Sequence, residues 1–197
     1  MNNIVLFFTK PRVFFQGKNK VLFPFLVYVL SAMVYLYSVK ELTIQKMALS
    51  FKDLPPNLAI DVHNTTFFMI VYGFSLVFLI LSFIVLSVIV FLGLKIFKKK
   101  MSYRETFSLL IHIYIPIAIG NFIVGLLNLL TGNHFTNFLY FFGVPSDFIS
   151  LNIFIFYSLF ILYIVLIEKI KVSSLISIII TVFVGIMMAI NSVGGSI

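Results

Sequence analysis

The sequence lacks the residues on which redox and thiolate chemistry depend. Its 197 residues include no cysteine and no tryptophan. Without cysteine there is no disulfide framework, no thiolate metal site and no cysteine nucleophile. Charged residues make up only 10% of the chain, whereas a soluble domain carries roughly 25%. Because so few charges cannot cover a water-facing surface, we expect lipid to be the solvent of this chain.

Catalytic signatures are missing as well. The sequence contains no H-E-x-x-H, no G-x-S-x-G, no paired glutamates within an apolar run and no Gly-rich phosphate loop. We therefore predict a protein that is not an enzyme and that uses no cofactor. Four polar residues fall on segments expected outside the membrane, but their spacing matches no metal signature, so we predict no metal site: Asp61, His63, His134 and Asp147.

Long hydrophobic runs dominate what is present. Hydrophobic residues make up 61% of the chain, and 25 residues are phenylalanine. About 20 apolar residues cross the hydrocarbon core of a bilayer as a helix. We therefore predict an all-α integral membrane protein, a bundle of five transmembrane helices with short interfacial segments. The predicted spans cover residues 21–39, 67–97, 107–130, 151–167 and 172–190, and residues 21–197 would form one membrane domain.

Two polar segments flank the first predicted span. Residues 1–20 mix basic residues with phenylalanines, and Pro11 breaks any single helix there. This N-terminal segment either lies on the inner membrane surface with its phenylalanines in the interface, or is a disordered basic region. Residues 40–66 are divided by Pro55 and Pro56, and we expect a short surface helix that ends before these prolines.

Basic residues predict the orientation. With a cytoplasmic N-terminus, 11 of the 14 Lys and Arg residues fall on cytoplasmic segments, and the C-terminus lies outside. The net charge of +8 is then an orientation signal, and we predict no nucleic-acid partner. The densest cluster marks the cytoplasmic side and is also a candidate site for anionic lipid or a cytoplasmic partner: Lys98, Lys99, Lys100 and Arg104.

The basic cluster runs directly into a helix start. The residues Ser102-Tyr-Arg-Glu105 match a capping box, in which the serine hydroxyl and the glutamate carboxylate each accept a backbone N–H of the other residue. An apolar run with His112 and Pro116 follows. We interpret His112 as a hydrogen-bonded structural or interfacial residue, and a functional intramembrane histidine is the alternative.

Small and polar residues predict where helices approach closely. The last predicted span has a small residue at every fourth position: Ser173, Ser177, Thr181, Gly185 and Ala189. On the third span, Asn121, Gly125 and Asn128 share a face. We interpret the asparagines as interhelical hydrogen-bonding residues with Gly125 as the contact point. In the alternative, the asparagines line an ion or substrate path.

Several of these elements together resemble a known family. They are a start that runs from Lys10-Pro11 to Phe14-Phe15, a basic loop that leads into Ser-Tyr-Arg-Glu-Thr-Phe, and Pro116 early in the third span. Two closely spaced final helices and an outer C-terminus complete the pattern. The chain is similar to the Yip domain family, the Ypt/Rab-interacting-protein superfamily, in its bacterial branch. This resemblance implies a five-helix membrane bundle.

The resemblance also bears on function. Eukaryotic members are associated with Rab GTPases, and we do not carry that role over, because bacteria lack Rab-dependent vesicle traffic. Some bacterial members accompany ABC-type export systems that act in peptide-toxin resistance. The Lys-, Asn-, Ile- and Phe-rich composition indicates an AT-rich bacterial genome and hence a bacterial plasma membrane. We expect a non-enzymatic accessory protein that contacts lipid and another membrane protein or itself. An autonomous small-molecule or ion transporter is the alternative.

Overall fold

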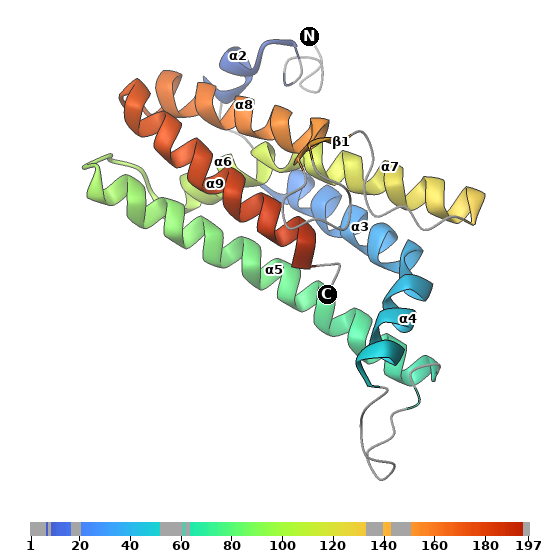
Figure 1. Ribbon diagram of the computed structural model, residues 1–197. Coiled ribbons are helices and arrows are strands. Elements are labelled where there is room, and N and C mark those ends of the chain that lie inside the picture. Colours follow the sequence, from blue (N-terminus) through green and yellow to red (C-terminus); the bar gives the residue numbers. More distant parts are fainter. Residues whose placement is uncertain are drawn as a thin grey trace.

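The fold is helical over nearly all of the chain that is described. The structure, a computed structural model, describes residues 7, 9–16, 21–51, 61, 64–132, 140–142 and 151–194. A short antiparallel pair, β1 (Tyr140–Phe142) and β2 (Leu151–Asn152), precedes the last two helices. The helices are α2 (Pro11–Gln16), α3 (Leu22–Ser38), α4 (Lys40–Ser50), α5 (Thr65–Ile96), α6 (Tyr103–Ile113), α7 (Ile115–Thr131), α8 (Ile153–Glu168) and α9 (Ser174–Gly194) (Figure 1).

Helix α5 is the clearest candidate for a membrane span. It has 32 residues, which corresponds to a length of about 48 Å. Among the described residues, no other single helix meets both the length and the composition of a span. The pairs α3–α4 and α6–α7, bent by 59° and 40°, qualify if each pair is counted as one span. Length and composition therefore support one span, or up to three, among the described residues. Two further helices are apolar but shorter than a span: α8, and α9 over Ser174–Met187.

The predicted third span is not one continuous helix. Helix α6 ends at Ile113 and α7 begins at Ile115, so the chain bends at Tyr114. Pro116 lies in the first turn of α7, where its missing N–H costs no intrahelical hydrogen bond. The predicted capping box is present and starts α6 at Tyr103. The Ser102 N–H donates to the Glu105 carboxylate at 2.8 Å, and the Glu105 N–H donates to the Ser102 hydroxyl at 3.3 Å.

The N-terminal segment packs into the protein. Helix α2 contacts α8, and Phe7 and Phe15 are buried in the core. The ring of Phe14 packs edge-on against the ring of Phe15, with 5.1 Å between the centroids. The first of the two alternatives, with the phenylalanines in the membrane interface, is therefore wrong for Phe7 and Phe15. Specific ring contacts explain the difference, because Phe15 packs edge-on against the rings of Phe7 and His112, and such pairs are favourable beyond their buried area.

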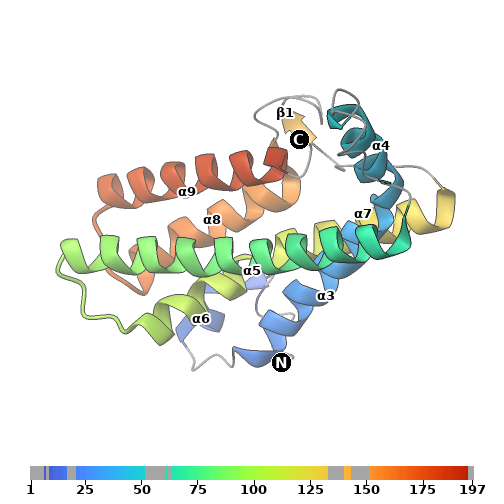
Figure 2. The ribbon, with the colours of Figure 1, turned by 90° about the horizontal axis from the view of Figure 1, so that it is seen from below.

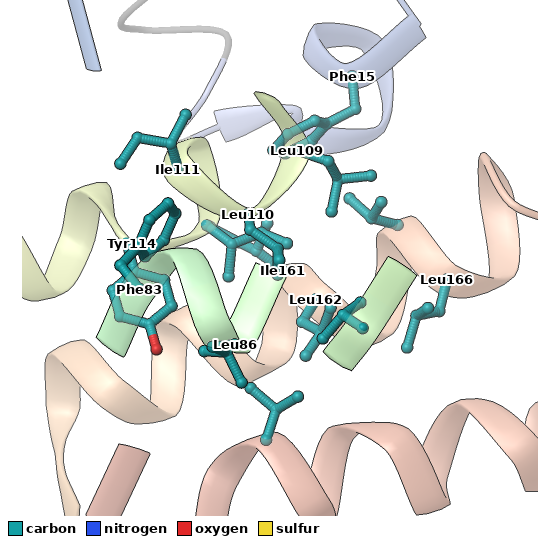
Figure 3. Packing of buried hydrophobic residues seen from close by; sticks show 14 of the residues in the cluster. Phe15, Phe83, Leu86, Leu109, Leu110, Ile111, Tyr114, Ile161, Leu162 and Leu166 are labelled. Carbon is teal, nitrogen blue, oxygen red and sulfur yellow. The ribbon is translucent and has the colours of Figure 1, made fainter. Parts of the chain in front are cut away.

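The core is formed mainly by α2, α5, α6 and α8, and α3, α7 and α9 each add a buried side chain, Tyr28, Ala118 and Val184. Leu110 of α6 and Ile161 and Leu162 of α8 are fully buried at its centre, and Phe15 of α2 closes one side (Figure 3). Because lipid is as apolar as these side chains, close van der Waals packing, and not removal from water, stabilises such a contact between membrane helices. Helices α8 and α9 lie antiparallel and side by side in both views (Figures 1 and 2). The most extensive packing between any two helices joins α3 to α7.

The predicted surface helix after the first span is present as α4. It turns away from α3 by 59° and ends at Ser50, before the prolines. The ammonium group of Lys40 lies 4.7 Å from the ring centroid of Phe68, near the start of α5. This cation–π contact holds α4 against α5.

Candidate functional site

A cavity with a basic lining lies at one end of the bundle. Its volume is ≈ 1440 Å³. Its lining comes from the start of α3, the segment between α5 and α6, the first part of α6 and the residues that follow α8. The end of α5 that precedes this segment is at the left in Figure 2. Four cationic side chains line this cavity, which we call the basic cavity: Lys99, Lys100, Arg104 and Lys169. Its apolar wall includes Leu22 and Phe25 of α3 and Phe107 of α6.

Two helix ends bring these cationic side chains together. After α5, Lys98 has a positive φ of 55°, and after α8, Lys171 has a positive φ of 59°. A left-handed residue at this position ends a helix and reverses the chain. The next residue after Lys98, Lys99, donates its N–H to the Leu94 carbonyl at 3.0 Å. Its side-chain ammonium group donates to the Lys171 carbonyl, so that the two connections are tied to each other.

Glu105 supplies a carboxylate to the same cavity. It accepts hydrogen bonds from both the N–H and the hydroxyl of Ser102, and these bonds, with the charge of Lys169, lower its pKa. Partial burial lowers the pKa of Lys169, and the Glu105 carboxylate opposes that shift. Four cations against one carboxylate leave an excess of three positive charges in the lining. The cavity therefore has the electrostatics of an anion-binding site.

The structure separates the predicted basic residues into two groups. Lys99, Lys100 and Arg104 line the basic cavity, whereas Lys98 is not among its lining residues. Sequence analysis missed Lys169 as a member of the site. The available signal was its place on a segment predicted to lie on the same side of the membrane. Charge counts carry no information on which loops touch, so this signal could not place Lys169 beside Lys99.

Helices α3 and α7 approach each other closely at Gly125. A Cβ atom built there would lie 2.9 Å from Val34 Cγ1 and 3.1 Å from the backbone nitrogen of Tyr35. One turn further, the buried Asn128 donates its side-chain N–H to the Ser38 hydroxyl at 3.3 Å. That hydroxyl in turn donates to the Tyr35 carbonyl at 2.7 Å. Asn121, on the same helix, is half-buried. The Asn128 geometry supports the interpretation as an interhelical hydrogen bond.

The small residues predicted for the last span, of which Ser173 directly precedes α9 and the others lie on it, are in different environments. Ser177 and Gly185 are buried, Thr181 is half-buried, Ser173 is exposed, and the side chain of Ala189 lies outside the described residues. A Cβ atom built on Gly185 would lie 3.0 Å from Cδ1 of Leu159 on α8. The hydroxyl groups of Ser177 and Thr181 are buried without a hydrogen-bond partner in the part of the chain that the structure describes.

His112 belongs to the packing of α2 against α6. Its Nδ1 lies 2.6 Å from the carbonyl oxygen of Ser108, one turn earlier on α6. The rings of Phe14 and Phe15 flank the imidazole at centroid distances of 5.4 and 6.2 Å. This is the environment of a hydrogen-bonded structural histidine. The described residues contain no group of three His, Asp or Glu side chains that could hold a metal ion, and three candidates lie outside them: His63, His134 and Asp147.

Comparison with known proteins identifies a family for the chain. No curated protein and no solved structure matches it. A family model described as the Yip1 domain matches residues 5–193, a range that holds every described helix except the end of α9. That family consists of membrane proteins and is not known as a family of enzymes. The helical fold and a match over nearly the whole length lead to one conclusion: the chain belongs to the Yip1 domain family.

Proposed function

We propose that this chain is a non-enzymatic interaction protein of a bacterial plasma membrane that accompanies an ABC-type exporter. It would cross the membrane five times, with the N-terminus in the cytoplasm and the C-terminus outside. Residues 21–197 would form the membrane domain, and residues 1–20 its cytoplasmic N-terminal segment. In this placement the basic cavity faces the cytoplasm. The partition of the basic residues supports this orientation.

The observation that carries the proposal is the exposed apolar surface of α5. Phe74 and Phe78 on this helix have 72% and 71% of their surface exposed. Helix α5 packs extensively only on α3 and α6 among the described elements. A contiguous apolar surface of this kind marks a contact with lipid or with another protein. The first half of α5 is therefore the surface that we assign to a partner helix.

Five spans require that the shorter helices also cross the membrane. Helix α8 has 16 residues, which gives a length of about 24 Å against a hydrocarbon core of about 30 Å. A short helix is accommodated when the bilayer thins locally or when flanking residues reach the interface, at a cost of fractions of a kcal/mol per Å. Glu168 and Lys169 at the end of α8 are suited to this, since both side chains are exposed.

Photo-crosslinking tests the partner. A benzoylphenylalanine placed at Phe78 of α5 should give one discrete adduct, which mass spectrometry identifies as a membrane subunit of an ABC-type transporter. The matched control places the same group at Phe23 of α3, which is 65% exposed and which we assign to lipid. The control should give no protein adduct. If Phe78 yields only lipid adducts, or only adducts of two copies of this chain, the accessory function is refuted.

The alternative, an autonomous transporter, predicts a water-filled path along Asn121 and Asn128. Asn128 is buried and engaged with Ser38, which does not favour such a path. Because the chain contains no cysteine, a single cysteine at either asparagine gives a clean test. Modification by a water-soluble maleimide would favour the transporter, and protection from both sides of the membrane would favour the accessory protein.

A further inference from the structure

We propose that the basic cavity binds the phosphate headgroup of an anionic phospholipid, whose acyl chains lie along its apolar wall. This inference goes beyond the partner protein proposed above. It rests on the proposed membrane placement, in which this end of the bundle lies at the cytoplasmic surface. The cavity, its charge and its apolar wall each contribute a separate part of the argument.

The cationic side chains converge on the cavity from two connections. Lys100 and Arg104 belong to the segment between α5 and α6 and the start of α6, whereas Lys169 follows α8. All three side chains are exposed and therefore reachable from the membrane surface. The guanidinium group binds phosphate oxygens through a planar pair of N–H groups, and an ammonium group adds a point charge. The carboxylate of Glu105 is already engaged by Ser102.

The apolar wall distinguishes a lipid from a free anion. Leu22 lines the cavity and is 70% exposed, and the rings of Phe25 and Phe107 meet behind it at a centroid distance of 6.4 Å. Inorganic phosphate would leave this wall and most of the ≈ 1440 Å³ unused. The wall continues along α3 into Phe23 and Leu26, which are also exposed. These exposed apolar side chains of α3 extend the surface that an acyl chain can contact beyond the cavity lining.

The lining is organised before any ligand arrives. The capping box holds the start of α6, and the bond from Lys99 to the Lys171 carbonyl ties the two basic connections together. Binding to an arrangement that is already ordered costs less conformational entropy than binding to a loop that must first be ordered. A preorganised lining is expected of a specific headgroup site. The diffuse attraction of a basic loop to an anionic membrane does not require one.

Native mass spectrometry of the full chain in detergent tests the inference. Phosphatidylglycerol and phosphatidylcholine with identical acyl chains are added in turn, and bound lipid is counted. The wild type should retain phosphatidylglycerol preferentially. The cavity variant Lys100→Gln/Arg104→Gln should bind phosphatidylglycerol at least about tenfold more weakly than the wild type. The matched control, Lys95→Gln/Lys98→Gln, removes the same charge from the same region but from residues that do not line the cavity. It should bind like the wild type.

Three results would overturn the inference. Equal losses in the two double variants would reveal diffuse attraction to basic residues. An absence of headgroup preference in the wild type would exclude an anionic-lipid site. Displacement of phosphatidylglycerol by inorganic phosphate at a similar concentration would identify a free anion as the ligand. The variant Lys169→Gln tests the residues that follow α8 in the same assay. It should also weaken phosphatidylglycerol binding.

The lipid and the partner proposals fail separately. Loss of headgroup preference with an intact Phe78 adduct to the transporter overturns only the lipid site. A missing adduct with intact preference for phosphatidylglycerol overturns only the partner. Phe78 lies on α5 and is not part of the cavity lining, so the two readouts do not share a residue.

Discussion

Two helix interfaces of this protein use small residues in different ways. Between α3 and α7, Gly125 faces backbone atoms of Val34 and Tyr35, and the nearby Asn128 is hydrogen-bonded to Ser38. Between α8 and α9, the atoms nearest to a Cβ built on Gly185 all belong to the flexible side chain of Leu159. The hydroxyl groups of Ser177 and Thr181 on α9 also lack hydrogen-bond partners among the described residues.

The difference separates a rigid contact from an adaptable one. Backbone atoms cannot move away from an added methyl group without a shift of the whole helix, whereas a leucine can change its rotamer. A satisfied buried hydrogen bond stabilises an interface, and an unsatisfied buried hydroxyl costs free energy. We therefore expect α3–α7 to be the fixed contact of the bundle and α8–α9 the one that tolerates change. Four substitutions, ordered by expected effect, test this comparison.

The largest effect is expected at Gly125. Gly125→Ala places a methyl group 2.9 Å from Val34 Cγ1 and 3.1 Å from the Tyr35 backbone nitrogen. Overpacking of this kind should lower the free energy of unfolding by about 2 kcal/mol. Reversible unfolding in mixed detergent micelles measures the change. The control is Gly73→Ala on α5, where an added Cβ meets nothing within 4 Å. Equal effects at the two glycines would show that helix propensity, and not close approach, is responsible.

A smaller loss is expected at Asn128. Asn128→Ala removes the bond to the Ser38 hydroxyl but leaves that hydroxyl bonded to the Tyr35 carbonyl. The free energy of unfolding should fall by about 1 kcal/mol, in the range of hydrogen bonds between membrane helices. The same unfolding assay applies, with Ser38→Ala combined with Asn128→Ala in a double-mutant cycle. Strictly additive effects of the two substitutions would contradict a direct interaction between them.

A substitution at Ser177 is expected to stabilise the protein. Ser177→Ala removes a fully buried hydroxyl that has no partner among the described residues. Its loss should raise the free energy of unfolding by about 0.5 kcal/mol, because the folded state no longer pays for desolvation of the group. Ser158→Ala on α8 removes a second buried hydroxyl that has no partner among the described residues, and it should change stability in the same direction. Destabilisation by Ser177→Ala would indicate a hydrogen bond at this position.

The smallest effect is expected at Gly185. Gly185→Ala brings a methyl group to 3.0 Å from Leu159 Cδ1, a contact that the leucine relieves by a small rotation. The better helix propensity of alanine offsets the remaining strain. The net change should stay below about 0.5 kcal/mol. Thermal unfolding of this variant beside Gly125→Ala makes the comparison direct, and a midpoint lowered as far as in Gly125→Ala would remove the distinction between the two interfaces.

Features that depend on neighbouring residues were predictable from the sequence. The capping box at Ser102 and Glu105 is a local pattern, and the structure has it. The shared face of Gly125 and Asn128 follows from the helical period alone. The helical class follows from the long apolar runs. None of these predictions required knowledge of which helix would lie opposite.

Features that depend on distant segments were not predictable. The docking of Phe15 beside His112 joins residues almost a hundred positions apart, and no pattern in the N-terminal segment names its partner. The same holds for Lys169, which joins Lys99 in the basic cavity only through the folded loops. The small residues at every fourth position predict one face of α9. How deeply each of them is buried depends on the side chains of α8 that lie opposite. The bend at Tyr114 was missed because Pro116 is compatible both with a straight helix start and with a kink.

The central claim is that the basic cavity faces the cytoplasm at one end of a membrane-spanning bundle. Labelling of two single-cysteine variants with a membrane-impermeant maleimide tests it most directly, since the chain has no native cysteine. Thr131→Cys at the end of α7 should react in intact cells. Lys100→Cys should react only after the membrane is opened to the cytoplasmic side. Reaction of Lys100→Cys in intact cells, or reaction of both variants from the same side, would contradict the account.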